Sequence, residues 1–124
     1  MEPKARILVV DDEEIVRISC ERILGPLGYS VDTTPDGLKA LELMGRSKYD
    51  LVLTDLKMPH MDGMEVMAEI RKREPDAKVI IVTGYSTIEV AVKAIKMGAY
   101  NYIEKPFSPE VLITAVREAL GETG

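Results

Sequence analysis

Leu51-Val52-Leu53-Thr54-Asp55, residues 51–55, is an apolar run of strand length that ends in an acid. A second run, Arg6–Val10 (RILVV), also ends in acid, at Asp11 and Asp12. A short, continuously apolar run bounded by polar residues is typical of a strand buried on both faces of a parallel sheet. We therefore predict that these strands are neighbours and that their carboxyl ends bring three carboxylates into one crevice.

Strand-like runs alternate with helix-like segments along the whole chain. Between the runs, apolar residues recur every three or four positions, as they do from Val16 to Leu27. Five such strand–helix repeats predict an α/β fold, a doubly wound five-stranded parallel sheet with helices on both faces and right-handed crossovers. The predicted strands are Arg6–Val10, Tyr29–Thr33, Leu51–Thr54, Val79–Thr83 and Asn101–Ile103. The second and fifth are more polar, which places them at the edges of the sheet.

Length and composition predict one globular domain. The 124 residues fall in the usual range for a single domain, and we expect 1–124 to form it, with a core at 5–120 and 121–124 as a frayed end or the start of a linker. The chain has no apolar run near the roughly 20 residues of a membrane span and no signal peptide, so we expect a cytoplasmic protein. The net charge of −5 and dispersed basic residues argue against direct nucleic-acid binding.

Four polar motifs fall at the predicted carboxyl ends of four strands. They are Asp11-Asp12, Asp55, Thr83-Gly84 and Lys105-Pro106. Any one of them has an ordinary explanation, since an acid pair or a threonine often caps a helix and a lysine is often solvated. Together they lie where doubly wound sheets bind ligands, at the carboxyl ends where the strand order reverses. We interpret them as one functional site.

The chemistry of these side chains indicates phosphoryl transfer. Two carboxylates about 4 Å apart repel by roughly 4 kcal/mol at an effective dielectric near 20, and a cation relieves that repulsion. Hard carboxylate oxygens suit Mg²⁺, which would also allow Asp55 to attack a phosphorus atom. Lys105 and Thr83 provide an ammonium and a hydroxyl to stabilise the transferring group.

Four spaced motifs resemble those of the receiver domains of two-component response regulators. They are Val9–Glu13 (VVDDE), Leu53–Pro59 (LTDLKMP) followed by Asp62-Gly63, Val82–Gly84 (VTG) and Glu104–Phe107 (EKPF). The resemblance covers almost the whole chain. It implies a flavodoxin-like (βα)5 fold with strand order 2-1-3-4-5. The segments around Thr83–Tyr85, Gly98–Tyr100 and Glu104–Phe107 most resemble receivers of NtrC-type transcriptional activators.

The resemblance also implies a role for each site residue. Asp55 would be the phosphoacceptor, and Asp12, Asp55 and the backbone carbonyl of Lys57 would be direct Mg²⁺ ligands. Asp11 would act through water. Thr83 and Lys105 would contact the phosphoryl group, Tyr102 would be an aromatic switch that responds to Thr83, and the Lys105–Pro106 bond would be cis.

The function implied is a phosphorylation-dependent signalling switch rather than a metabolic enzyme. A sensor histidine kinase would donate the phosphoryl group, and the output would be transcriptional. The predicted helix Ile88–Met97 carries two apolar stripes, and we predict that Ile88, Ala91, Val92, Ile95 and Ala99 face the core. The other stripe, Val90, Ala94 and Met97, would then form a homodimer or output surface with the Tyr102 strand. Ile15 and Ile18 also lie off their core stripe, and the resemblance suggests kinase docking there.

Three other interpretations are open. A flavodoxin-like flavin carrier shares the architecture, but Asp11–Glu14 would repel the flavin phosphate. An Mg²⁺-dependent phosphohydrolase with an aspartate nucleophile normally has a second acid two residues later, where this chain has Lys57. A receiver-shaped binding module could work unphosphorylated. We interpret Cys20 as an inert buried residue and His60 as a solvent-facing loop residue.

Overall fold

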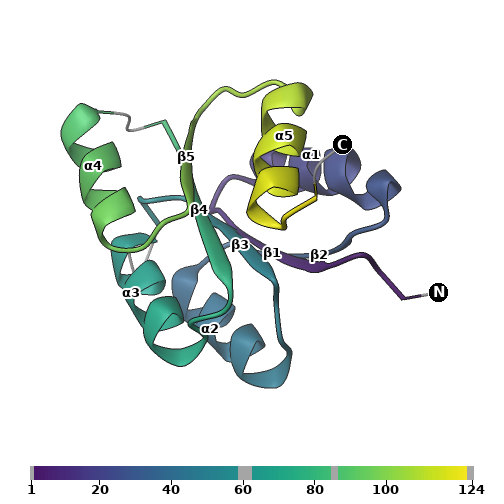
Figure 1. Cartoon of the computed structure of the whole chain (residues 1–124), viewed down its shortest axis with the longest axis horizontal. Coiled ribbons are helices and arrows are strands. Elements are labelled where there is room, and N and C mark those ends of the chain that lie inside the picture. The colour runs from purple at the N-terminus through teal and green to yellow at the C-terminus, as the bar shows by residue number, and fades with distance from the viewer. Residues whose placement is uncertain (1, 59–62, 85–86, 123–124) are drawn as a thin grey trace.

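A computed structural model describes residues 2–58, 63–84 and 87–122. Its centre is one five-stranded parallel sheet in the order β2-β1-β3-β4-β5, as predicted (Figure 1). The elements in chain order are β1 (Arg6–Val10), α1 (Glu14–Leu24), the 3₁₀ helix η1 (Gly25–Leu27), β2 (Ser30–Thr34), α2 (Gly37–Arg46), β3 (Leu51–Thr54), α3 (Gly63–Arg73), β4 (Lys78–Thr83), α4 (Ile88–Lys96), β5 (Asn101–Glu104) and α5 (Pro109–Ala119). His60, for which we predicted a loop position, lies outside the described residues.

Helices cover both faces of the sheet, α1 and α5 on one face and α2, α3 and α4 on the other (Figure 1). Alternate residues of the central strands β1, β3 and β4 contribute to the two cores, so these strands are buried on both sides, as their sequences predict. Cys20 is 1% exposed in the core beneath α1. Its burial raises the pKa of the thiol to about 12, which agrees with an inert residue.

The orientation of α4 contradicts our prediction. Ala94 is fully buried and Val90 and Met97 pack against the core, whereas Ile88 and Ile95 are exposed. Most of the circumference of this helix is apolar, and the edge of the sheet can cover only part of it. The small side chain of Ala94 lets the helix approach β5 closely, so this side is buried. The predicted partner surface of Val90, Ala94 and Met97 is therefore wrong.

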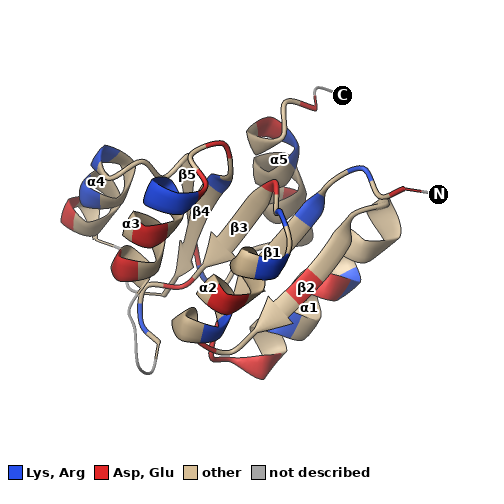
Figure 2. Ribbon diagram, turned by 90° about the horizontal axis from the view of Figure 1, so that it is seen from below, with Lys and Arg blue, Asp and Glu red and all other residues tan. Residues whose placement is uncertain are grey.

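Basic and acidic residues are interspersed along the helices (Figure 2). This mixed distribution agrees with the expectation from the sequence that the lysines and arginines are dispersed. Among the described residues, none of the helices is both long and apolar enough to cross a bilayer.

Hydrogen bonds fix the described end of the chain. The Gly121 amide donates to the Glu118 carbonyl at 3.1 Å in a left-handed turn, with φ of 74° at Gly121. The Tyr29 hydroxyl donates to the Glu122 carboxylate at a distance of 2.5 Å. Of the predicted frayed end or linker at 121–124, Gly121 and Glu122 are thus held against the domain, and 123–124 lie outside the described residues.

Candidate functional site

The register of the central strands places two aspartates side by side. Val10 pairs with Thr54, so Asp11 and Asp55 both follow directly after paired residues. The Asp55 amide donates to the Val10 carbonyl at 3.0 Å, which continues the ladder to the first residue beyond the strands. Asp11 is 1% exposed and Asp55 is 6% exposed. The sheet therefore holds two carboxylates in a buried position at its carboxyl edge.

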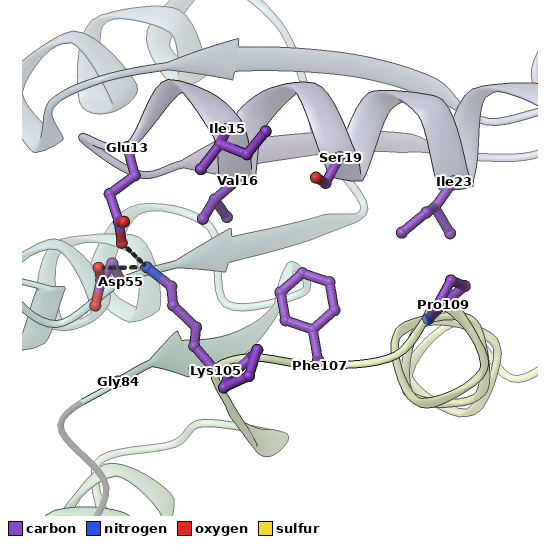
Figure 3. Close-up of a pocket in the computed structure, with 11 residues that line it drawn as sticks. Glu13, Ile15, Val16, Ser19, Ile23, Asp55, Gly84, Lys105, Phe107 and Pro109 are labelled. Carbon is purple, nitrogen blue, oxygen red and sulfur yellow. Dashed lines mark hydrogen bonds and ion pairs between the residues drawn. The ribbon is translucent and has the colours of Figure 1, made fainter.

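Lys105 bridges three carboxylates at this edge. Its Nζ atom lies 2.7 Å from Asp11 Oδ2, 2.8 Å from Glu13 Oε1 and 2.9 Å from Asp55 Oδ2. Figure 3 shows Lys105 reaching from the loop after β5 toward Glu13 and Asp55. The second oxygen of Asp55, Oδ1, accepts from the Leu56 amide at 2.6 Å. The acid cluster is thus compensated by one ammonium and by backbone donors.

The electrostatics of the cluster follow from burial. Burial raises the pKa of the Asp11 carboxyl above its ordinary value; the hydrogen bond from Lys105 opposes this shift and the charge of Asp55 adds to it. Burial alone would lower the pKa of Lys105, but its hydrogen bonds with Asp11, Glu13 and Asp55 outweigh burial and raise the pKa. The lysine is therefore fully charged at neutral pH and neutralises part of the acid cluster.

The three predicted metal-ligating aspartates do come together. Asp11, Asp12 and Asp55 each offer a carboxylate oxygen, and these oxygens lie within 4.8 Å of one another. Asp12 is exposed, so the cluster opens toward solvent. An all-oxygen donor set with one solvent-facing side fits Mg²⁺, which prefers oxygen ligands and keeps several waters. Lys57, whose carbonyl we predicted as a further ligand, lies in the described segment just beyond Asp55.

A backbone hydrogen bond joins Lys105 to Thr83 on the adjacent strand. Thr83, at the end of β4, pairs with Glu104, and the Lys105 amide donates to the Thr83 carbonyl at 3.0 Å. Thr83 is fully buried, and the Lys105–Pro106 bond is cis as the resemblance implied. Tyr102 on β5 packs partly buried against the core that includes α4. All the residues predicted for phosphoryl chemistry thus lie on adjacent strand ends.

A groove of about 640 Å³ runs from Asp55 along α1. In Figure 3 the α1 side chains Ile15, Val16, Ser19 and Ile23 lie opposite Phe107 and Pro109, with Lys105 and Asp55 at one end. Ile15 is 67% exposed, as expected for a residue off the core stripe, and Ile18 is half-buried. The groove gives an apolar approach to the acid cluster.

Sequence reasoning assigned no role to two residues that the structure places at the site. Glu13 contacts Lys105 although the two lie 92 positions apart. Gly63 lies so close to the Asp55 backbone that a β-carbon there would be 1.9 Å from the Asp55 carbonyl oxygen. A signal for Glu13 was its place at a helix N-cap, where Ser, Thr, Asp or Asn is favoured.

The fold and the site define a doubly wound α/β domain with a lysine-bridged acid cluster at the carboxyl edge of its sheet. The family model for the response regulator receiver domain matches residues 7–117. This chain therefore belongs to the response regulator receiver domain family. Receiver domains are phosphorylation-dependent switches of two-component signalling that bind Mg²⁺ at an acidic pocket, and members of this family are generally not metabolic enzymes.

Individual relatives agree with this assignment. The chain is 38% identical over 118 residues to the response regulator MprA of Mycobacterium sp. (strain KMS), covering 95% of this chain and 51% of that protein. It is 40% identical over 115 residues to a putative NtrX-like response regulator of Rickettsia bellii, covering 91% of this chain and 24% of that protein. The chain thus spans about half or less of the length of these curated relatives.

Solved structures agree as well. The beryllofluoride-activated NtrC4 receiver domain dimer, a solution structure, has a TM-score of 0.90 and 38% identity, covering 94% of this chain and 97% of that one. These similarities confirm the resemblance to NtrC-type receivers.

Proposed function

We propose that this chain accepts a phosphoryl group on Asp55 from a sensor histidine kinase, with Mg²⁺, and thereby controls a transcriptional output. The observation that carries the proposal is the contact of Lys105 Nζ with Asp55 Oδ2 at 2.9 Å, inside a cluster where Asp11 and Asp12 also converge. In this proposal 1–124 is one receiver domain and acts in the cytoplasm. Its only chemistry is its own aspartyl phosphorylation and dephosphorylation.

The proposed reaction follows from the groups around Asp55. A carboxylate oxygen of Asp55 forms a bond to the phosphorus of the donor, and the P–N bond of a phosphohistidine, or the P–O bond of acetyl phosphate, breaks with its electron pair on the leaving group. Mg²⁺, when held by Asp11, Asp12, Asp55 and the Lys57 carbonyl, would neutralise charge on the phosphoryl oxygens. Lys105 is placed to pair with one phosphoryl oxygen, and Thr83 lies on the adjacent strand.

The signal would travel from Thr83 to α4. Phosphorylation replaces one negative charge by about two and adds three acceptor oxygens beside Lys105. Thr83 ends β4, and the next described helix is α4, whose inner side packs with Tyr102 against the core. We propose that movement of Thr83 toward the phosphoryl group changes the packing of Tyr102 and so shifts α4.

Asp55→Asn is expected to abolish phosphorylation. Wild-type protein incubated with Mg²⁺ and acetyl phosphate should gain about 80 Da in intact mass, the mass of one phosphoryl group, while the asparagine variant, whose amide is a poor nucleophile, should gain none. Asp50→Asn is a matched control, since Asp50 precedes β3 on the opposite edge of the sheet and is exposed. An unmodified wild type, or equal addition to Asp55→Asn, would reject Asp55 as the acceptor.

Two exposed apolar surfaces support separate partner proposals. The groove beside Ile15 leads to Asp55, so we propose that the kinase docks there. On α4, the exposed residues Ile88, Val92 and Ile95 replace the mispredicted stripe as the surface for a second copy or an output domain. The NtrC4 receiver is a dimer when activated, which favours a second copy.

Ile15→Asp and Ile88→Asp should impair different activities, phosphotransfer in the first variant and self-association in the second. Both side chains are largely exposed, at 67% and 84%, so neither substitution should unfold the domain. Ile15→Asp should slow phosphotransfer from the cognate kinase about tenfold and leave acetyl phosphate labelling and self-association unchanged, because loss of an apolar anchor costs about 1–2 kcal/mol. Ile88→Asp should weaken phosphorylation-dependent self-association, measured by analytical ultracentrifugation, and leave phosphotransfer unchanged. Identical profiles for the two variants would contradict the assignment.

A further inference from the structure

Glu13 differs from the other two acids that contact Lys105. The side chains of Asp11 and Asp55 are 2% and 7% exposed, but that of Glu13 is 56% exposed. The three N–H groups of an ammonium can each serve one acceptor, and here all three acceptors are carboxylates. Glu13 is therefore the one acid of the three whose carboxylate can leave Lys105 and be solvated without a change in the buried core.

The local structure indicates that the Glu13 side chain is used for this contact. Glu13 is the N-cap residue of α1, where a short polar side chain usually accepts a hydrogen bond from the first turn. Its side chain makes no such cap bond and extends to Lys105 instead, while its amide donates to Asp11 Oδ1 at 2.9 Å and its carbonyl accepts from Arg17. The backbone of Glu13 is thus fixed, and its side chain remains adjustable.

Glu13 also borders the approach to Asp55. It lines the groove together with Asp55, Gly84 and Lys105 (Figure 3). A phosphodonor that enters this end of the groove brings anionic oxygens toward both the Lys105 ammonium and the Glu13 carboxylate. The anionic oxygens of the donor and the Glu13 carboxylate repel each other. Because the three N–H groups of the Lys105 ammonium already have acceptors, one of these acceptors must be replaced by a phosphoryl oxygen.

We propose that Glu13 is a positioning residue that holds Lys105 in the unphosphorylated protein and is displaced by the phosphoryl group, which takes its place as the third acceptor. The inference rests on the proposed function of Asp55. Because Glu13 competes with the phosphoryl oxygens, it lowers the affinity of the site for a tetrahedral anion. It thereby shifts the balance toward the unphosphorylated form.

The test compares Glu13→Gln with Glu14→Gln. Glutamine keeps the length and the acceptor oxygen of Glu13 but removes its charge, and Glu14→Gln removes the same charge from the exposed next residue of α1. At saturating Mg²⁺, Glu13→Gln should bind beryllofluoride about two- to fivefold more tightly by calorimetry, the range expected for an exposed ion pair. Its aspartyl phosphate should also be lost more slowly, while Glu14→Gln should stay near wild type in both measurements.

Three results would overturn the proposed role of Glu13. Unchanged or weaker anion binding by Glu13→Gln would overturn the proposal, and so would an equal gain in Glu14→Gln, which would indicate a general charge effect. In a Lys105→Met background the Glu13→Gln substitution should have no further effect, since its partner is gone; a persisting gain would also overturn the proposal. Failure of the wild type to gain 80 Da from acetyl phosphate would instead reject Asp55 as the acceptor, and the inference with it.

Discussion

Gly63→Ala is expected to destabilise the folded protein by about 3 kcal/mol and to lower phosphorylation at Asp55, because overpacking against atoms that cannot move is costly. A β-carbon at Gly63 would lie 1.9 Å from the Asp55 carbonyl oxygen and 2.7 Å from the Leu56 α-carbon. Both are backbone atoms of the segment that leaves β3, so no side-chain rotation relieves the overlap. The Gly63 amide also donates to the Leu56 carbonyl at 2.8 Å, which ties the start of α3 to this segment. Urea unfolding followed by circular dichroism measures the loss.

Gly45→Ala provides the matched control. Gly45 is exposed near the end of α2, and a β-carbon there would meet no atom within 4 Å. Because alanine is favoured over glycine inside a helix by up to about 1 kcal/mol, this variant should be as stable as wild type or slightly more stable. If Gly63→Ala unfolds at the same urea concentration as Gly45→Ala, the close approach of α3 to the Asp55 backbone is not required.

The fold was predictable because its central strands have an unusual composition. Strands buried on both faces must be apolar at every position, and Leu51–Leu53 and Val79–Val82 are. The ends of the strands were less accurate: β4 begins at Lys78 rather than Val79, and β5 extends to Glu104 rather than Ile103. Backbone pairing continues past the last apolar residue when a neighbouring strand is present, and side-chain pattern does not record this.

The composition of the site was predictable for a related reason. Parallel strands end at one edge, so residues after β1, β3, β4 and β5 must meet there whatever their separation in the chain. The contact of Glu13 with Lys105 depends on side-chain length and direction, which periodicity does not give. The predicted orientation of α4 was wrong for a similar reason. Ala94 and Ile95 are both apolar, and only the fit of the helix against the sheet selects Ala94 for burial.

Lys105→Met is expected to destabilise the metal-free protein by about 3 kcal/mol at pH 7, because removal of one partner leaves buried charges uncompensated. Lys105 is 12% exposed and is the shared partner of Asp11 and Asp55, whose side chains are almost completely buried. Methionine keeps most of the volume and removes the charge, so the loss reports electrostatics rather than a cavity. Lys48→Met, on an exposed residue of the loop before β3, should change the free energy of unfolding by less than about 1 kcal/mol.

The pH dependence of Lys105→Met should identify the cause. Burial already raises the pKa of Asp11 above its ordinary value of 3.8, and loss of Lys105, whose hydrogen bond and charge lower that pKa, should raise it further. A carboxyl whose folded pKa is raised gives stability that is present below its unfolded pKa and is lost as pH rises through the folded pKa. The difference in the free energy of unfolding between Lys105→Met and the wild type should therefore become smaller as pH falls from 7 toward 4.

Magnesium gives an independent check on the same variant. Without the Lys105 ammonium, the carboxylates of Asp11, Asp12 and Asp55 attract a divalent cation more strongly. A ligand that binds only the folded state stabilises that state. Added Mg²⁺ should thus raise the unfolding midpoint of Lys105→Met more than that of the wild type. A deficit that changes with neither pH nor Mg²⁺ would mean that Lys105 supports the fold by packing, and that the acid cluster does not need its charge.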